Sequence, residues 1–168
     1  MANKIQNFDT GEKDNSNIIH LDLDPKINIE NKIYFKNLLK KIAECSLDNL
    51  EENLENLYHV DAEFNGFHPI NEIKGIEEIK NKYFIPLKKA FPDLERRNNL
   101  VIGGAFRDKV FVSFISHLTG TFKNEWLGVK STNKTIYLRT CEAHQITNNK
   151  IIKSYTLIDT VDFIRQAG

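Results

Sequence analysis

The sequence has no excess of charge of either sign and no long hydrophobic run. Lysine plus arginine and aspartate plus glutamate each number 23 in 168 residues, so the formal net charge is zero. A neutral chain without a basic cluster gives no electrostatic reason to expect a nucleic acid or an anionic membrane as partner. The apolar runs are also far too short to span a bilayer. We therefore expect no nucleic-acid partner and no membrane partner.

Cysteine is scarce, and no secretion signal is visible. The two cysteines, Cys45 and Cys141, have no CxxC spacing, which favours free thiols in a reducing compartment. The first residues are polar and lack the apolar segment that a signal peptide requires. These features predict a cytoplasmic protein.

The motifs that announce cofactor chemistry are missing as well. The sequence contains no GxGxxG or GxxxxGK[ST] loop for nucleotides, no HExxH, paired CxxC or HxH spacing for metals, and no GxSxG elbow for a serine nucleophile. We therefore predict a site without metal or organic cofactor.

The chain divides by composition into an arm and one domain. Residues 1–30 are rich in Asn, Asp and Lys, and we interpret them as an arm that is flexible or docks on a partner. Within the arm, Ile18–Asp24 alternates apolar and polar residues, as an edge strand or docking segment would. Residues 31–168 have the length of a single domain with one core.

Helical patterns occupy the first half of this domain. Apolar residues at helical spacing over Phe35–Ile42 predict one helix, and Ser46 as N-cap predicts a second over Leu47–Leu57. Gly75 precedes a third helix, and Pro86 should kink it or start a new turn.

The second half has the character of a β-sheet. The predicted strands are Val60–Gly66, Leu94–Ile102, Lys109–Thr119, Thr135–Thr147 and Lys150–Ile158, and a last short helix covers about Thr160–Ala167. Helices followed by a meander of strands predict an α+β fold, with N-terminal helices packed on the concave face of a curved antiparallel sheet.

The last two strands form a hairpin whose register can be predicted. Asn148 and Asn149 tolerate positive φ, as a two-residue type I′ turn requires. Counting back from this turn predicts that the opposed pairs are Thr147 with Lys150, Ile146 with Ile151, His144 with Lys153, Glu142 with Tyr155, Thr140 with Leu157 and Leu138 with Asp159. Opposed residues share a face.

This face therefore gathers His144, Glu142, Tyr155 and Asp159 among apolar residues. A buried ionised carboxylate persists only if it is paired, hydrogen-bonded or shifted in pKa. A partly desolvated carboxylate near a histidine and a phenol can move a proton on a bound carbon acid. The pattern thus indicates an acid/base site.

Structural interpretations of the same residues remain open. Asp159 could simply cap the last helix, and His144 could be a solvated residue near the turn. Tyr155 could be an ordinary core phenol, and Glu142 could form a surface ion pair. The other histidines, His59, His68 and His117, each fit a structural role when considered singly.

Three segments resemble the SnoaL-like polyketide cyclases of the nuclear transport factor 2-like superfamily. They are Gly75–Leu94, His117–Ile146 and Asn149–Gly168, and the likeness covers about residue 33 to the end. The resemblance implies a cone-shaped α+β barrel around an apolar cavity, and a homodimer through the outer face of the sheet. Lys153 departs from the family pattern, which commonly has glutamate there.

The resemblance also implies roles for particular residues. The family's aspartate at the end of the last strand, which acts as acid/base in an aldol closure without cofactor, matches Asp159. His144 corresponds to a histidine on the neighbouring strand, and Tyr155 to an aromatic residue.

These arguments predict a small-molecule enzyme that performs aldol cyclisation, isomerisation or dehydration on an apolar carbonyl compound. The expected catalytic residues are Asp159, His144 and Tyr155; the expected substrate-binding residues are Glu142, Trp126, Phe64, Phe67, His68, His117 and Leu157. Phe64, Phe67 and Trp126 would form an apolar mouth and lid. The alternative is a non-catalytic module of the same fold that binds a small ligand or dimerises.

Overall fold

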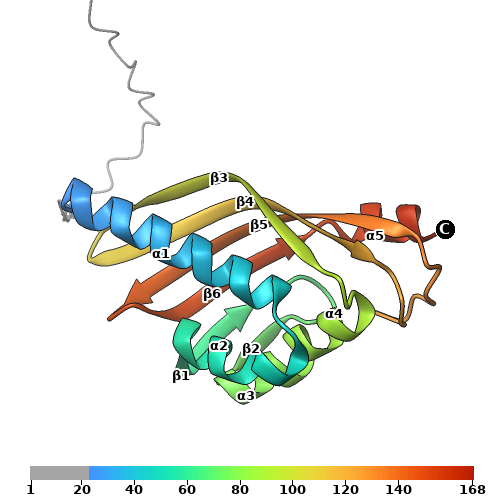
Figure 1. The fold of residues 1–168 in the computed structure, drawn as a ribbon. Coiled ribbons are helices and arrows are strands. Elements are labelled where there is room, and N and C mark those ends of the chain that lie inside the picture. The colour runs from blue at the N-terminus through green and yellow to red at the C-terminus, as the bar shows by residue number, and fades with distance from the viewer. Residues whose placement is uncertain (1–22) are drawn as a thin grey trace, which may run out of the picture.

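The computed structural model describes residues 23–168, which form one bent sheet with helices against it (Figure 1). The helical elements are α1 (Pro25–Glu44), the short 3-10 helix η1 (Leu47–Asn49), α2 (Leu50–Leu57), α3 (Ile76–Ile79), the π-helix η2 (Lys80–Phe84), α4 (Ile85–Ala90) and α5 (Thr160–Ala167). The strands are β1 (Tyr58–Asn65), β2 (Glu72–Lys74), β3 (Glu95–Phe106), β4 (Lys109–Thr121), β5 (Thr135–Thr147) and β6 (Lys150–Ile158). The predicted α+β class is confirmed. Within residues 23–168 no helix is both long and apolar enough to cross a membrane.

The sheet has the order β2-β1-β6-β5-β4-β3 and stays open between β2 and β3. Neighbouring strands are antiparallel with one exception, since β1 runs parallel to β6. The parallel pairing of β1 with β6 differs from the antiparallel sheet predicted from the sequence. Helices and four strands separate β1 from β6 in the chain, so no hairpin fixes their relative direction.

Helix α1 crosses the concave face of the sheet and buries one side against it (Figure 1). The helix begins before the predicted apolar stripe, because Asp24 accepts a hydrogen bond from the Lys26 amide at 2.7 Å and Pro25 occupies the first turn. Its buried residues are Phe35, Leu39, Ile42 and Ala43. Most of the predicted Ile18–Asp24 strand lies outside the described residues.

The predicted interruption at Pro86 is confirmed. The third helical segment consists of α3, η2 and α4, and Pro86 lies in the first turn of α4. Proline has no amide hydrogen to donate to the preceding turn. The wider π-helical turn before it carries Tyr83 and Phe84, and both side chains are buried.

The β5–β6 hairpin begins as predicted and then changes register. Asn148 and Asn149 have φ of 50° and 58°, and Ile146 pairs with Ile151. The next β5 residue, Gln145, pairs with Lys153, so Ile152 is an extra residue in a β-bulge.

One extra residue reverses the face of every β6 side chain beyond it. His144 therefore lies opposite Ser154, and Glu142 lies opposite Thr156. The predicted pairs of His144 with Lys153, Glu142 with Tyr155, and Thr140 with Leu157 are wrong. Tyr155 and Leu157 are exposed on the outer face, at 45% and 60%.

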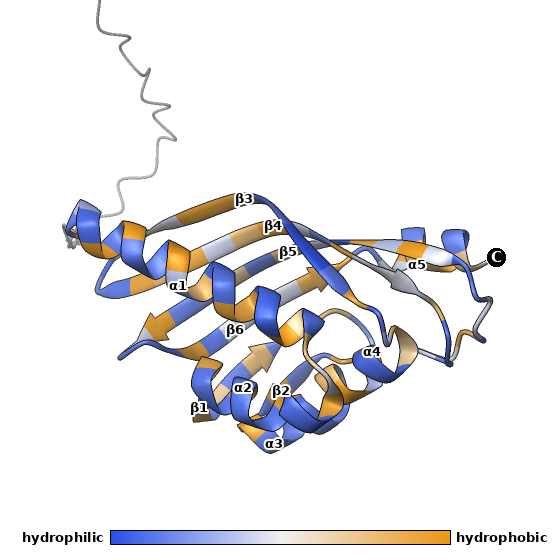
Figure 2. Cartoon of the chain, viewed as in Figure 1, coloured by the Kyte–Doolittle hydropathy of each residue, from blue (hydrophilic) through white to orange (hydrophobic). Residues whose placement is uncertain are grey.

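The bulge removes a lysine from the interior. In the predicted register the Lys153 side chain would share the buried face with His144, at a large desolvation cost. In the structure the Lys153 ammonium instead pairs with Glu63 at 2.8 Å, and both side chains reach solvent. The hydroxyl of Ser154 takes the inner position. Figure 2 shows the resulting alternation of hydrophobic and hydrophilic residues along the strands.

Candidate active site

A buried ion pair joins β3 to β5 on the concave face of the sheet. The Arg96 guanidinium donates to both carboxylate oxygens of Glu142, from Nη1 to Oε1 at 2.9 Å and from Nη2 to Oε2 at 3.1 Å. Each side chain is 5% exposed. A bidentate pair of this kind is among the strongest charge-assisted contacts.

Neighbouring polar groups form further hydrogen bonds with this ion pair. Arg96 also donates to Ser116 Oγ at 3.0 Å and to Asn98 Oδ1 at 2.9 Å, and the Thr140 hydroxyl donates to Glu142 Oε1 at 2.8 Å. Burial alone raises the pKa of Glu142, but the Arg96 guanidinium and then His144 more than offset this effect. The pKa of Glu142 therefore lies well below its ordinary value, and the carboxylate is ionised.

His144 links this carboxylate to β6 and β1. Its Nε2 lies 3.3 Å from Glu142 Oε2, and its Nδ1 lies 2.6 Å from Ser154 Oγ. Ser154 Oγ lies 3.3 Å from the Tyr58 hydroxyl. Since an ionised carboxylate only accepts, Nε2 carries a proton; in the neutral ring Nδ1 then accepts from Ser154, and Ser154 accepts from Tyr58.

We call Tyr58, Ser154, His144 and Glu142 the proton relay. All four are at most 5% exposed. Burial raises the pKa of Tyr58, so its phenol stays protonated at neutral pH. The relay is therefore a continuous hydrogen-bonded path from a neutral phenol to an ionised carboxylate.

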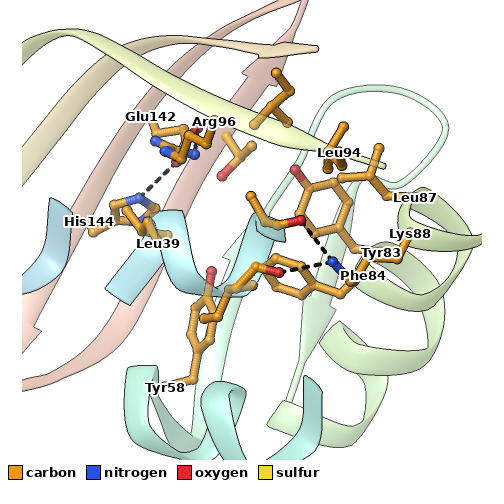
Figure 3. A pocket seen from close by; sticks show the side chains of 14 residues that line it. Leu39, Tyr58, Tyr83, Phe84, Leu87, Lys88, Leu94, Arg96, Glu142 and His144 are labelled. Atoms are coloured by element: carbon orange, nitrogen blue, oxygen red, sulfur yellow. Dashed lines mark hydrogen bonds and ion pairs between the residues drawn. The ribbon is translucent and has the colours of Figure 1, made fainter. Parts of the chain in front are cut away.

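A small cavity lies between the relay and the helices (Figure 3). Its volume is about 30 Å³, room for one or two waters. The lining residues are Leu39, Ile42, Ala43, Tyr58, Tyr83, Phe84, Leu87, Lys88, Leu94, Arg96, Leu118, Glu142, His144 and Thr156. Tyr58 and His144 thus border the cavity, whereas Ser154 lies behind them and cannot act as a nucleophile on its contents.

The structure brings together two of the predicted site residues, His144 and Glu142. It places Asp159 elsewhere. The Asp159 carboxylate caps α5 by accepting from the Asp162 amide at 2.9 Å, and it pairs with Arg139 at 2.9 Å. Its side chain is 37% exposed. The expectation that Asp159, Tyr155 and Leu157 share the inner face with His144 is wrong, because the β-bulge moves these β6 side chains to the opposite face of the sheet.

The remaining predicted binding residues do not line the cavity either. Phe64, Phe67 and Trp126 are buried in the aromatic core, where the rings of Phe67 and Trp126 are 6.0 Å apart. His68 is exposed, and His117 bonds the exposed Asn99 side chain through Nδ1 at 3.0 Å.

Sequence reasoning missed Arg96, Tyr58 and Ser154. A signal for Arg96 exists, because Leu94, Arg96 and Asn98 alternate, so that an inward Leu94 predicts an inward Arg96. The bulge hid Ser154, and Tyr58 begins a strand whose start was predicted two residues later. Within residues 23–168 no group of three or more His, Cys, Asp or Glu side chains is placed to hold a metal ion.

Comparisons with known proteins agree on the family and the fold. Residues 36–167 match the family model described as SnoaL-like polyketide cyclase. No curated protein matches the sequence.

Solved structures share the fold at low identity. A SnoaL-like polyketide cyclase from Jannaschia sp. CCS1 has a TM-score of 0.70 and 18% identity, over 88% of this chain and 96% of that one. IdmH, described as a polyketide cyclase from Streptomyces antibioticus, has a TM-score of 0.66 and 15% identity, over 82% and 97%. A nuclear transport factor 2-like protein from Salmonella enterica serovar Typhimurium has a TM-score of 0.61 and 14% identity, over 78% and 89%.

Proposed function

Since the chain belongs to the SnoaL-like polyketide cyclase family, we propose that it is a small-molecule enzyme that performs cofactor-independent acid/base chemistry on an apolar carbonyl compound. The reaction would be an aldol cyclisation, an isomerisation or a dehydration. The observation that carries the proposal is the buried proton relay, which ends at the Tyr58 phenol beside the cavity.

Tyr58 is the group that would touch the substrate oxygen. In the charged state of the relay, His144 is an imidazolium with a proton on Nδ1. That proton passes to Ser154 Oγ, the Ser154 proton passes to Tyr58, and the Tyr58 proton passes to the carbonyl oxygen of the substrate. Each step exchanges one O–H or N–H bond for another, so Tyr58 and Ser154 remain neutral and His144 returns to its neutral form. The reverse sequence removes a proton from a hydroxyl group.

Glu142 would stabilise the charged state of His144. Its carboxylate lies 3.3 Å from Nε2 and stays ionised beside Arg96. A buried imidazolium without such a partner would be strongly disfavoured. Arg96 in turn fixes the carboxylate through two hydrogen bonds, so Glu142 and Arg96 position the histidine and do not touch the substrate.

Protonation of a substrate oxygen serves all three reaction types. It makes the carbonyl carbon of an aldol acceptor more electrophilic. It also promotes enolisation for isomerisation, in which a water in the cavity would take the proton from the α-carbon. A proton given to a hydroxyl oxygen converts it into a leaving water for dehydration. A positioned acid typically contributes about 10²–10⁴-fold in rate.

A second candidate is a module of the same fold that binds a small ligand without turnover. The cavity of about 30 Å³ and the hydrogen bonds at both nitrogens of His144 favour it. In both candidates the aromatic side chains that line the cavity must move before an organic ligand enters. The two candidates differ in whether the bound ligand exchanges protons with the protein.

Proton exchange on a model ketone separates the two candidates. We expect the protein to accelerate deuterium incorporation next to the carbonyl of 2-tetralone in D₂O, measured by ¹H NMR. Ser154→Ala and Tyr58→Phe should each remove most of the acceleration while the protein remains folded by circular dichroism. Saturable binding of 2-tetralone without any accelerated exchange would contradict the enzyme proposal and support the binding module.

A further inference from the structure

Lys88 is a buried lysine that borders the same cavity as the proton relay. It lies on α4, and its side chain is 5% exposed. Figure 3 shows it on the helical wall, across the cavity from His144 and Glu142 on the sheet. The relay does not use Lys88.

The Lys88 ammonium uses two of its three protons in hydrogen bonds. Its Nζ donates to the carbonyl oxygens of Ile42 at 3.1 Å and Ala43 at 2.8 Å, which belong to the last turn of α1 and have no partner within that helix. An ammonium group carries three protons. Within residues 23–168 Nζ makes no third hydrogen bond.

The charge of Lys88 is also uncompensated by an ion pair. Within residues 23–168 no carboxylate lies within 4.0 Å of Nζ. The other buried cation at the cavity, Arg96, is neutralised by Glu142. Burial lowers the pKa of Lys88, while Cys45 and Glu44, at the end of α1, act from a distance to raise it.

We propose that the Lys88 ammonium binds a carboxylate of the ligand, so that the cavity takes an apolar carbonyl compound with an acidic group. An anion at this position would accept the third proton and supply the missing counter-charge in a poorly solvated place, where such a contact is strongest. The carboxylate of the ligand would lie beside Lys88 on α4, and its reacting carbonyl group would lie beside Tyr58 on the other side of the cavity. This inference rests on the proposed function and names the class of its substrate.

A ligand of this class needs more room than the cavity has. Tyr83 and Phe84 are the aromatic side chains next to Lys88, and they come from the π-helix η2. Single π-helical turns inside helices occur often at functional sites. Outward movement of these two rings would enlarge the cavity from the side on which Lys88 lies.

The test compares two probes of nearly the same shape, one with a carboxylate and one with an uncharged amide. We measure by isothermal titration calorimetry the affinities of 3-phenylpropionate and 3-phenylpropionamide for the full chain. The acid should bind at least about tenfold more tightly than the amide. Lys88→Met should abolish this preference, whereas Lys89→Met, which removes an exposed charge from the same helix, should leave it unchanged.

Three results would overturn the inference: equal affinities for the wild-type protein, a preference that survives Lys88→Met, or no binding of either probe. A purely structural role for Lys88, as a cap of α1, predicts lower stability in Lys88→Met without any preference in the wild type. If Lys88→Met does not fold, Lys88→Arg keeps the charge and must keep the preference. The exchange of 2-tetralone protons is measured separately, so failure of the enzyme proposal is distinguishable from failure of this one.

Discussion

The Arg96 guanidinium and the Glu142 carboxylate form a bidentate ion pair in the interior, at 2.9 and 3.1 Å. The pair connects β3 and β5, which lie on either side of β4 in the sheet, so its geometry depends on the alignment of these three strands. The ion pair lies next to His144 and keeps Glu142, the last member of the proton relay, ionised.

Removal of one partner of this pair should destabilise the protein strongly. Glu142→Gln leaves the Arg96 charge buried without a counter-charge, and we expect a loss of about 3–5 kcal/mol in the free energy of unfolding. Urea denaturation followed by circular dichroism measures it.

Glu63→Gln is the matched control for this prediction. Its carboxylate forms an ion pair with Lys153 near the surface, so we expect a loss of only about 0–1 kcal/mol. Similar losses for the two variants would contradict the assignment of Glu142 to a desolvated pair.

The lowered pKa of Glu142 makes the free energy of unfolding depend on pH. The group is ionised in the folded protein at pH values where it would already be protonated in the unfolded chain. Its contribution is therefore complete above the ordinary glutamate pKa of about 4.3 and is lost as pH falls further, toward the folded pKa. Unfolding free energies measured between neutral pH and pH 3 should fall more steeply for the wild type than for Glu142→Gln. Parallel curves would refute this cause of acid sensitivity.

Asp159 should behave as a helix cap. Asp159→Ala removes the acceptor for the Asp162 amide, and we expect a loss of about 0.5–2 kcal/mol in stability. Asp159→Asn retains a side-chain oxygen for the cap and should be nearly as stable as the wild type. Thermal unfolding of both variants tests this, and equal destabilisation by the two would show that the cap is not what Asp159 contributes.

The outer face of the sheet carries an exposed apolar row. Leu100, Ile115, Cys141 and Leu157 are opposed in register across β3, β4, β5 and β6, and all four are exposed. Exposed apolar patches on a sheet often mark a protein interface. The family resemblance predicts a homodimer at this face, and a second copy would cover the row isologously.

Analytical ultracentrifugation tests the homodimer. We expect the wild type to sediment as a dimer and Leu157→Asp, which puts a charge into the row, to sediment as a folded monomer. Val161→Asp is the control, because this exposed apolar residue lies on α5 and outside the row. A dimer that persists in Leu157→Asp would place the interface elsewhere.

The sequence predicted the elements well and the inner face only in part. Ser46 holds the predicted N-cap position before η1, although its hydroxyl accepts from the Asn49 side chain and not from a backbone amide. Asn148 and Asn149 form the predicted turn with positive φ. His144 and Glu142 share a face because strict alternation holds along β5.

The error on β6 has a definite physical origin. The stretch Ile151–Lys153 has no glycine or proline to signal a bulge, and the gain from the bulge is tertiary: it moves Lys153 to solvent and Ser154 inward. A one-residue slip of this kind cannot be deduced from alternation alone. Because of this slip, the predicted site contained Tyr155 where the structure has Ser154. The slip also put Asp159 on the inner face, where the structure does not have it.

The most direct test of the account compares two substitutions in one assay. Deuterium exchange on 2-tetralone is measured for His144→Gln, in the interior, and for Asp159→Asn, at the helix cap. We predict that His144→Gln loses the acceleration by at least about a hundredfold and that Asp159→Asn keeps the wild-type rate. Full exchange activity in His144→Gln together with its loss in Asp159→Asn would contradict the claim that protons move through the buried relay.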